Sequence, residues 1–315
     1  MEWAALPAAI MPSFTGLSGG SGAVATLSDT PSDNLSERNT GLRRLALAFA
    51  LLMASASASL AASDVDVTCT IMLDAATGKT LIEEGDCAAR TTPASTFKIP
   101  LAVIGYDTGF LKDAATPVLS YNKGDPDWGG ANWLRDTSPA DWMRYSVVWY
   151  SQRITRDLGR ETLERYLRGF KYGNADLSGE AGFDNGLERA WIASSLEVSP
   201  REQVAFLRGL VSGTLAVGPE ALEKAKRIVE SRAVGDWTIH GKTGTAFPRR
   251  ADRSFDYAHG WGWYVGWAEP NAEKDRTVVF ARLIRTRART KTSPGVLTRD
   301  ALFAQWPELA KTLRP

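Results

Sequence analysis

The chain has 315 residues, of which 44% are hydrophobic and 23% are charged, so it can build a large apolar core and is not a disordered protein. Its 37 Lys and Arg residues nearly balance its 36 Asp and Glu residues, and a formal net charge of +1 gives no long-range attraction for nucleic acid or an anionic membrane. Two cysteines and two histidines argue against a disulfide-dense scaffold, a four-thiolate zinc site and a multi-histidine centre, and we expect no metal.

The first 62 residues have the features of a processed segment. Residues 1–40 are rich in Ser, Gly, Ala and Thr, and Arg43 and Arg44 then precede the apolar run 45–53 and a series of small residues. This pattern is typical of a secretory signal peptide, and the run is too short for a membrane span, which needs about 20 residues. We expect residues 1–62 to be a leader and signal peptide, disordered or removed, with a later translation start as an alternative for the leader. Residues 63–315 are then a secreted, periplasmic domain without a membrane anchor.

The first predicted elements of this domain are the two strands of a hairpin. The first strand covers residues 67–73, the turn covers 76–79, and the second strand begins at 81. Cys69 and Cys87 flank the hairpin, and Gly78 in the turn lies at their midpoint, so the two thiols could face each other across the ladder. In an oxidising compartment we expect a disulfide between them, with two buried free thiols as the alternative.

Helices are predicted in the middle of the chain, and strands return towards its end. The predicted helices cover residues 140–158, 160–169, 200–211, 219–232 and 298–313, and the later strands cover 236–240, 260–267 and 277–284. In the strand 260–267, bulky side chains alternate mostly with glycines, and a glycine face lets a helix approach closely. We expect an α+β fold in which one antiparallel sheet is built from both chain ends, with helices packed on it and a helical lobe inserted between the strand groups.

Three short motifs carry candidate chemistry. Ser95 and Lys98 form an S-x-x-K pair, whose helical spacing brings an amine beside a hydroxyl that it can activate as a nucleophile. An S-x-V motif follows at Ser146-Val147-Val148, and Lys242-Thr243-Gly244 ends a predicted strand, with Thr245 after it.

Each motif is weak alone, because similar sequences occur elsewhere in the chain. Ser120 and Lys123 also match S-x-x-K, and residues 291–293 resemble the third motif within a polar loop. Residues 16–20 match the nucleophile elbow G-x-S-x-G without a strand before or a helix after, so we reject that match. The order S-x-x-K, S-x-V, K-T-G along one chain is much more specific than any of its parts.

With these motifs in this order, the sequence resembles the class D (oxacillinase-type) serine β-lactamases, within the penicillin-recognising serine enzymes. The resemblance runs from about residue 68 to the C-terminus and includes residues 172–174 (Tyr-Gly-Asn), the run 190–203 and the run 261–267. Class A enzymes would need Ser-Asp-Asn where this chain has Ser146-Val147-Val148. The resemblance implies a β-lactamase/transpeptidase-like fold and hydrolysis of β-lactams, which confers antibiotic resistance.

The resemblance also implies a role for each motif residue. Ser95 attacks the lactam carbonyl to form an acyl-enzyme, and Lys98 carries a carbamate, made from carbon dioxide or bicarbonate, that acts as general base. No other cofactor is expected. The carbamate can form only on the neutral amine of Lys98, because only that form reacts with carbon dioxide, and desolvation favours the neutral form. Proton transfer is assigned to Ser146 and Lys242, and substrate binding to Val148, Trp191, Thr243, Gly244, Thr245 and Arg299. Trp191 is also the expected donor to the carbamate, and the oxyanion hole would use the backbone N–H groups of residues 95 and 245.

Several alternatives stay open at this stage. A penicillin-binding or sensing module would be acylated without turnover, although neither a transmembrane anchor nor a polar residue at position 148 supports it. A D,D-peptidase acting on cell-wall peptides is the second rival. Each of three further features also has a purely structural alternative. Trp191 could be a core aromatic, residues 172–174 a plain turn, and the tract 282–291 a solvated loop. The sequence predicts neither the oligomeric state nor which β-lactams are hydrolysed.

Overall fold

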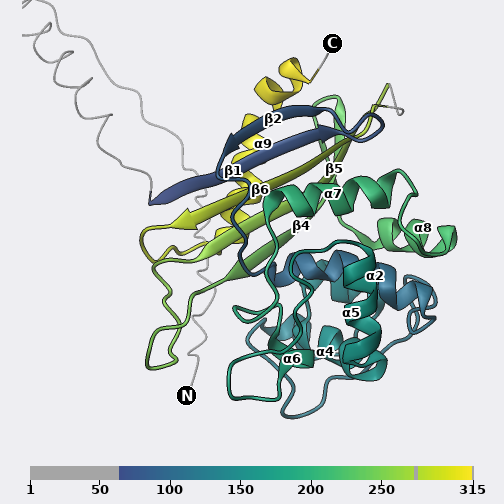
Figure 1. Cartoon of the computed structure of the whole chain (residues 1–315), viewed down its shortest axis with the longest axis vertical. Helices are drawn as coiled ribbons and strands as arrows, with labels where there is room; N and C mark the ends of the chain where they lie inside the picture. The colour runs from purple at the N-terminus through teal and green to yellow at the C-terminus, as the bar shows by residue number, and fades with distance from the viewer. Residues whose placement is uncertain (1–63, 273–275, 314–315) are drawn as a thin grey trace, which may run out of the picture. The chain divides into compact units, whose positions relative to one another are not determined.

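The strands from the two ends of the domain form one six-stranded sheet. The computed structural model describes residues 64–272 and 276–313, so the predicted leader and signal peptide over 1–62 lie outside the described residues. The strand order is β2-β1-β6-β5-β4-β3, and every neighbouring pair is antiparallel (Figure 1). The strands are β1 (Val65–Asp74), β2 (Thr80–Gly85), β3 (Ser231–Val234), β4 (Trp237–Ala246), β5 (Trp261–Pro270) and β6 (Val278–Thr286). The expected α+β fold, with one antiparallel sheet built from both ends, is confirmed.

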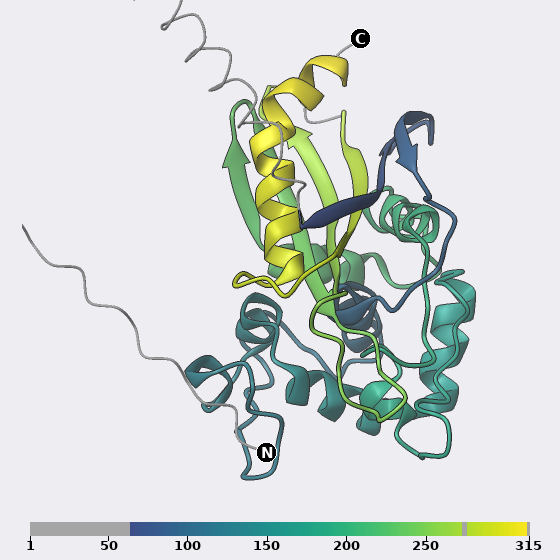
Figure 2. The ribbon, with the colours of Figure 1, turned by 90° about the vertical axis from the view of Figure 1, so that its left-hand side faces the viewer.

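Helices cover both faces of this sheet. The C-terminal helix α9 packs on one face, and α7 packs on the other together with the helical lobe (Figures 1 and 2). The helices are η1 (Ala94–Phe97), α2 (Lys98–Asp107), η2 (Ala131–Trp133), α3 (Pro139–Tyr145), α4 (Val148–Leu158), α5 (Arg160–Gly169), α6 (Gly186–Arg189), α7 (Pro200–Val211), α8 (Pro219–Ile228) and α9 (Pro294–Thr312). Among the described residues, no helix combines the length and the apolar character that a membrane span requires.

The boundaries of α7 follow from local chemistry and agree with the prediction. Ser199 caps the helix, because its side chain accepts the backbone N–H of Glu202 while the Glu202 carboxylate accepts the N–H of Ser199. Pro200 occupies the first turn, where its missing N–H is not needed. These three residues fix the start of the helix that covers the lobe-facing side of the sheet.

Two predicted helices are wrong in extent. The helix predicted over 140–158 is two helices, because Ser146 has a left-handed φ of 58° and Val147 is extended. The helix predicted over 219–232 ends at Ile228, and residues 231–234 instead form β3 along β4. At residues 231–234 pairing with β4 overrides a helical preference that amounts to less than about 1 kcal/mol per residue.

The glycine face of β5 receives α9, as the alternation predicts. A Cβ at Gly262 would lie 2.4 Å from the carbonyl oxygen of Pro294 and 2.6 Å from Thr298 Oγ1. On the opposite face, Trp263 and Val265 are fully buried in the core shared with the lobe. The start of α9 therefore lies directly against β5, beside the strand β4 that carries the third motif.

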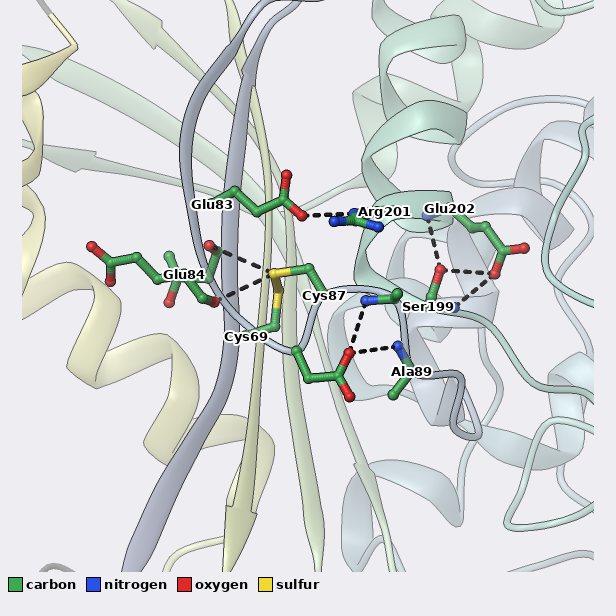
Figure 3. The surroundings of a disulfide bond; sticks show 11 residues. Cys69, Glu83, Glu84, Cys87, Ala89, Ser199, Arg201 and Glu202 are labelled. Carbon is green, nitrogen blue, oxygen red and sulfur yellow. Dashed lines mark hydrogen bonds and ion pairs between the residues drawn. A yellow bond between two sulfur atoms is a disulfide. The ribbon is translucent and has the colours of Figure 1, made fainter.

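The predicted disulfide between Cys69 and Cys87 is present, with a Cα–Cα distance of 5.1 Å (Figure 3). The register behind the prediction is nevertheless wrong. The hairpin is centred before Gly78, so that Cys69 pairs with Gly85 even after a bulge between Met72 and Leu73 has shifted the ladder by one residue, and Cys87 lies two residues beyond β2. The disulfide thus ties β1 to the segment that leaves the hairpin towards η1.

Candidate active site

Ser95 lies in the short helix η1, and Lys98 is the first residue of α2. The backbone N–H of Lys98 donates to the carbonyl oxygen of Ser95, so the two residues occupy one continuous turn. Ser95 is half-buried, whereas Thr96 on the same turn is buried and donates its hydroxyl to the Pro93 carbonyl at 2.7 Å. Ser95 is therefore partly accessible on a turn that is closed by internal hydrogen bonds.

Lys98 is an unusual lysine, because its side chain is 1% exposed and its amine has no hydrogen-bond partner among residues 64–272 and 276–313. Burial, together with the nearby charge of Lys242, holds the pKa of Lys98 well below its ordinary value of 10.5. Burial favours the neutral form of this amine, because the charged form loses its hydration and finds no acceptor among the described residues. The site thus contains a nucleophilic amine one turn from a serine hydroxyl.

Lys242 is the second buried lysine of the site, at 2% exposure. Burial lowers its pKa to about 8, while the charge of Glu230 acts in the opposite direction and that of Arg299 in the same direction. Its amine donates to the backbone carbonyl of Thr243 at 3.3 Å. A lysine with a pKa near 8 can both give and accept a proton close to neutral pH.

Gly244 brings β4 into contact with the serine turn. A Cβ at this position would lie 2.9 Å from the Pro93 carbonyl oxygen and 3.0 Å from Thr96 Cγ2. On the side of α9, the hydroxyl of Thr245 accepts the backbone N–H of Gly295 at 2.9 Å. The strand segment 242–245 therefore packs between η1 and the start of α9. It lies inside β4, which continues to Ala246, rather than at the strand end predicted from the sequence.

Ser146 and Val148 lie at the junction of α3 and α4. Ser146 ends α3 in the left-handed conformation, and its backbone N–H donates to the carbonyl of Trp142. Val148 begins α4, is buried, and belongs to the same apolar core as Phe97 of the serine turn. An apolar residue at position 148 adds to the desolvation of this region.

Trp191 packs directly on the turn that carries Ser95 and Lys98. Its ring stacks on Phe97 with a centroid distance of 5.3 Å, and the side chain is 1% exposed. Its backbone carbonyl accepts the hydroxyl of Thr92 at 2.8 Å, and the carbonyl of Thr92 accepts the indole N–H of Trp263 at 2.9 Å. One buried threonine thus joins the segment after α6, strand β5 and the serine turn.

Residues 172–174 hold the segment that follows Trp191. Gly173 has a φ of 58°, and a Cβ there would lie 2.0 Å from the carbonyl oxygen of Glu197. The Asn174 amide donates to the Ser195 carbonyl at 2.8 Å, and its side-chain oxygen accepts the N–H of Glu197 at 3.0 Å. The Tyr-Gly-Asn turn therefore joins two segments through hydrogen bonds of the Asn174 side chain.

Two supporting residues were missed from the sequence. Gln203 of α7 is buried, donates to Thr96 Oγ1 at 2.9 Å and accepts the hydroxyl of Tyr172 at 3.3 Å. It lies on the apolar stripe of α7 with Phe206 and Leu210, and a polar residue in such a stripe is a detectable signal. Thr92, the second, carries no comparable pattern.

Arg299 lies in the second turn of α9, close enough to Lys242 for its charge to help lower the pKa of that lysine. It shares with Thr243 a cavity of about 220 Å³ between β4 and α9, and its side chain is one-third exposed. Its guanidinium pairs with Asp300 of the same helix at 2.8 Å. Arg299 and Thr243 thus line one cavity, which the side chain of Glu230 also lines.

The competing matches lie elsewhere or are solvated. Ser120, Lys123 and Lys291 are all exposed, so neither place offers a buried amine. Residues 16–20 lie outside the described residues.

Comparisons with known proteins agree with this geometry. Residues 68–305 match the family model of the penicillin binding protein transpeptidase domain. The chain is 39% identical over 246 residues to β-lactamase OXA-9 of Klebsiella pneumoniae, covering 76% of this chain and 87% of that protein. It is 35% identical over 201 residues to β-lactamase OXA-1 of Escherichia coli, covering 63% and 69%. The crystal structure of the OXA-427 class D β-lactamase matches with a TM-score of 0.72 and 43% identity, covering 78% of this chain and 99% of that one.

Proposed function

The chain belongs to the class D serine β-lactamases, and we propose that it hydrolyses β-lactam antibiotics through an acyl-enzyme on Ser95, with a carboxylated Lys98 as general base. One observation carries this proposal: the amine of Lys98 is buried, unpartnered within the described chain and depressed in pKa, one turn from the serine. Burial favours the neutral amine, and the neutral amine is the form that reacts with carbon dioxide.

The chemistry of Lys98 follows from its surroundings. Carbon dioxide adds to the neutral amine with loss of one proton, and the product is anionic, so the neighbouring Lys242 cation favours it. A carbamate at Lys98 would supply the base that accepts the Ser95 proton in acylation and a proton from water in deacylation. General base catalysis of this kind contributes about 10²–10⁴-fold.

The remaining groups act on charge and position. Lys242, with a pKa of about 8, and Ser146 would deliver a proton to the lactam nitrogen as its bond to the carbonyl breaks. The backbone N–H groups of Ser95 and Thr245 would stabilise the oxyanion, and Thr243 with Arg299 would bind the carboxylate of the substrate. We further propose export to the periplasm, on the basic and apolar pattern of residues 43–62, and a role in β-lactam resistance.

The test is the intact mass of the protein after a short pulse of benzylpenicillin, followed over minutes. Wild type should gain and then lose one penicilloyl group, and Ser95→Ala should gain none. Ser120→Ala, at the exposed S-x-x-K match, should keep its activity within about threefold, since exposed substitutions rarely change function or stability much. A wild-type adduct that persists would indicate a sensing module, and release of D-alanine from a peptide without penicillin turnover would indicate a peptidase.

A further inference from the structure

A hydrogen bond from outside α3 and α4 reaches the S-x-V turn that joins these two helices. The indole Nε1 of Trp133, in the short helix η2, donates to the backbone carbonyl of Tyr145 at 2.8 Å. Tyr145 is the last residue of α3, and its carbonyl is one of those at a helix end that have no partner within the helix. Ser146 follows immediately, so the indole binds the peptide unit that leads into the motif.

The peptide units on both sides of Ser146 are held by hydrogen bonds. In the preceding unit, the carbonyl of Tyr145 accepts the indole N–H, and the N–H of Ser146 donates to the Trp142 carbonyl. In the following unit, the N–H of Val147 donates to the same Trp142 carbonyl at 3.1 Å. The orientations of these two peptide planes determine where the Cα–Cβ bond of Ser146 points. Of the three bonds, the one from Trp133 comes from a separate element.

The backbone of Ser146 depends on such restraints. Its φ of 58° lies in the left-handed region, which residues with a Cβ rarely adopt and keep only where their surroundings hold them. Without the indole bond, the preceding peptide unit would lose one of its two anchors. Rotation of that unit towards a more favourable φ would then move the hydroxyl of Ser146.

Trp133 has little freedom of its own. Its side chain is 5% exposed, and its backbone carbonyl accepts the indole N–H of Trp149, a buried residue of α4, at 2.8 Å. The backbone of the preceding loop lies against the Trp133 ring, since a Cβ at Gly129 would be 1.9 Å from Trp133 Cε2. The element η2 thus binds the end of α3 and is itself bound by α4. An indole fixed in this way restrains the peptide unit that it binds.

We infer that Trp133 is a positioning residue for β-lactam hydrolysis, whose indole N–H keeps the Ser146 hydroxyl in the direction that proton transfer to the lactam nitrogen requires. The inference rests on the proposed function, in which Ser146 takes part in that transfer. Trp133 acts through the peptide unit before Ser146, and no contact with the reacting groups is assigned to it. Because proton transfer needs donor and acceptor within hydrogen-bond reach, loss of the indole bond slows acylation.

The experiment is a double-mutant cycle between positions 133 and 146, measured as kcat/KM for nitrocefin. Trp133→Phe removes the donor and should lower the value about tenfold, the upper range for a single hydrogen bond. In the Ser146→Ala background, where the hydroxyl to be positioned is absent, the same substitution should change the value by less than about twofold.

A second variant separates the hydrogen bond from the packing of the ring. Trp133→benzothienylalanine replaces the indole N–H by sulfur and keeps the shape of the side chain, so it leaves no cavity in the core. It should reproduce both results of the Phe variant. Near-UV circular dichroism and thermal unfolding show that each variant is folded.

The matched control is Trp306→Phe, the same truncation at another buried tryptophan. Trp306 is 1% exposed and lies in the core between the sheet and α9, and its indole N–H has no partner among the described residues. This substitution removes the same atoms from a core that the S-x-V turn does not share. It should therefore leave kcat/KM unchanged in both backgrounds.

A loss of the same size in both backgrounds would overturn the inference, because a purely structural role of Trp133 does not depend on the Ser146 hydroxyl. An unchanged kcat/KM in Trp133→benzothienylalanine would overturn it as well. Ser146→Ala with the activity of wild type would also overturn it, together with the role given to Ser146. The proposed function is refuted by a different result, which is failure of wild type to hydrolyse nitrocefin.

Discussion

Replacing Trp191 by Phe separates packing from chemistry at the centre of the site. The substitution keeps an aromatic ring against Phe97, and the hydrogen bond from Thr92 survives because it goes to the backbone carbonyl. The variant loses part of the indole and its N–H donor. A core truncation of this size costs about 1–3 kcal/mol, which a domain stable by about 5–15 kcal/mol tolerates. We therefore expect a folded protein.

The expected chemical effect follows from the state of Lys98. Its amine finds no partner within the described residues, and Trp191 stacks on Phe97, the residue before Lys98, so we expect the indole N–H to stabilise an anionic carbamate. A hydrogen bond to a charged group contributes about 1.5–3 kcal/mol, which is a roughly tenfold to hundredfold change in the carboxylation equilibrium. Most of the Lys98 in the variant should then be uncarboxylated, and deacylation should be slower than acylation.

Rapid-mixing kinetics with nitrocefin provide the assay. Trp191→Phe should show a burst followed by a slow phase, the acyl-enzyme should be visible by mass, and added bicarbonate should restore part of the slow rate. Wild type measured with and without bicarbonate is the control. An unchanged steady-state rate in the variant would refute the reasoning and leave Trp191 as a packing residue only.

Two further predictions concern stability. The disulfide closes a separation of 18 residues, so the double variant Cys69→Ala with Cys87→Ala should have a free energy of unfolding in urea that is about 3 kcal/mol lower than that of wild type. An unchanged urea midpoint would contradict the chain-entropy argument. Lys98→Met should be inactive but more stable at neutral pH in buffer without carbon dioxide. The pKa of Lys98 is lowered from 10.5 only in the folded state, so the unfolded chain binds more protons and wild-type stability rises with pH up to about that value. Thermal unfolding of both proteins from about pH 6 to pH 9 tests this, because Lys98→Met should lack that part of the slope.

The fold was predictable where a single stretch of sequence carries the whole signal. The alternation in residues 261–267 predicts both a buried strand and a close helix, and the contacts of Gly262 with the start of α9 confirm both. Ser199, Pro200 and Glu202 likewise mark the beginning of α7 through bonds within four residues. Such features depend on neighbours in the chain, so tertiary structure changes them little.

Features set by distant contacts were not predictable. Residues 231–234 form a strand because β4 lies beside them, and the bulge at Met72 moves the partner of Cys69 to Gly85. The same holds for the site. The three motifs mark Ser95, Lys98 and Lys242, whereas the bonds of Thr92 and Gln203 join residues that are 99 and 107 positions apart. No local pattern encodes a pairing at that separation.

Residues with unfavourable backbone angles show where these distant contacts override the local conformational preference of the chain. Ala94, Ser146 and Ala193 have φ values of 51°, 58° and 52°, in the left-handed region that residues with a Cβ rarely adopt. Each such conformation costs about 1–3 kcal/mol and persists only where the surroundings hold it. Three of the six described non-glycine residues with a positive φ therefore lie at the site: Ala94 before Ser95, Ser146 in the S-x-V turn, and Ala193 two residues after Trp191. The fold holds the reacting groups at some cost in local stability, and a motif alone identifies the groups without revealing their geometry.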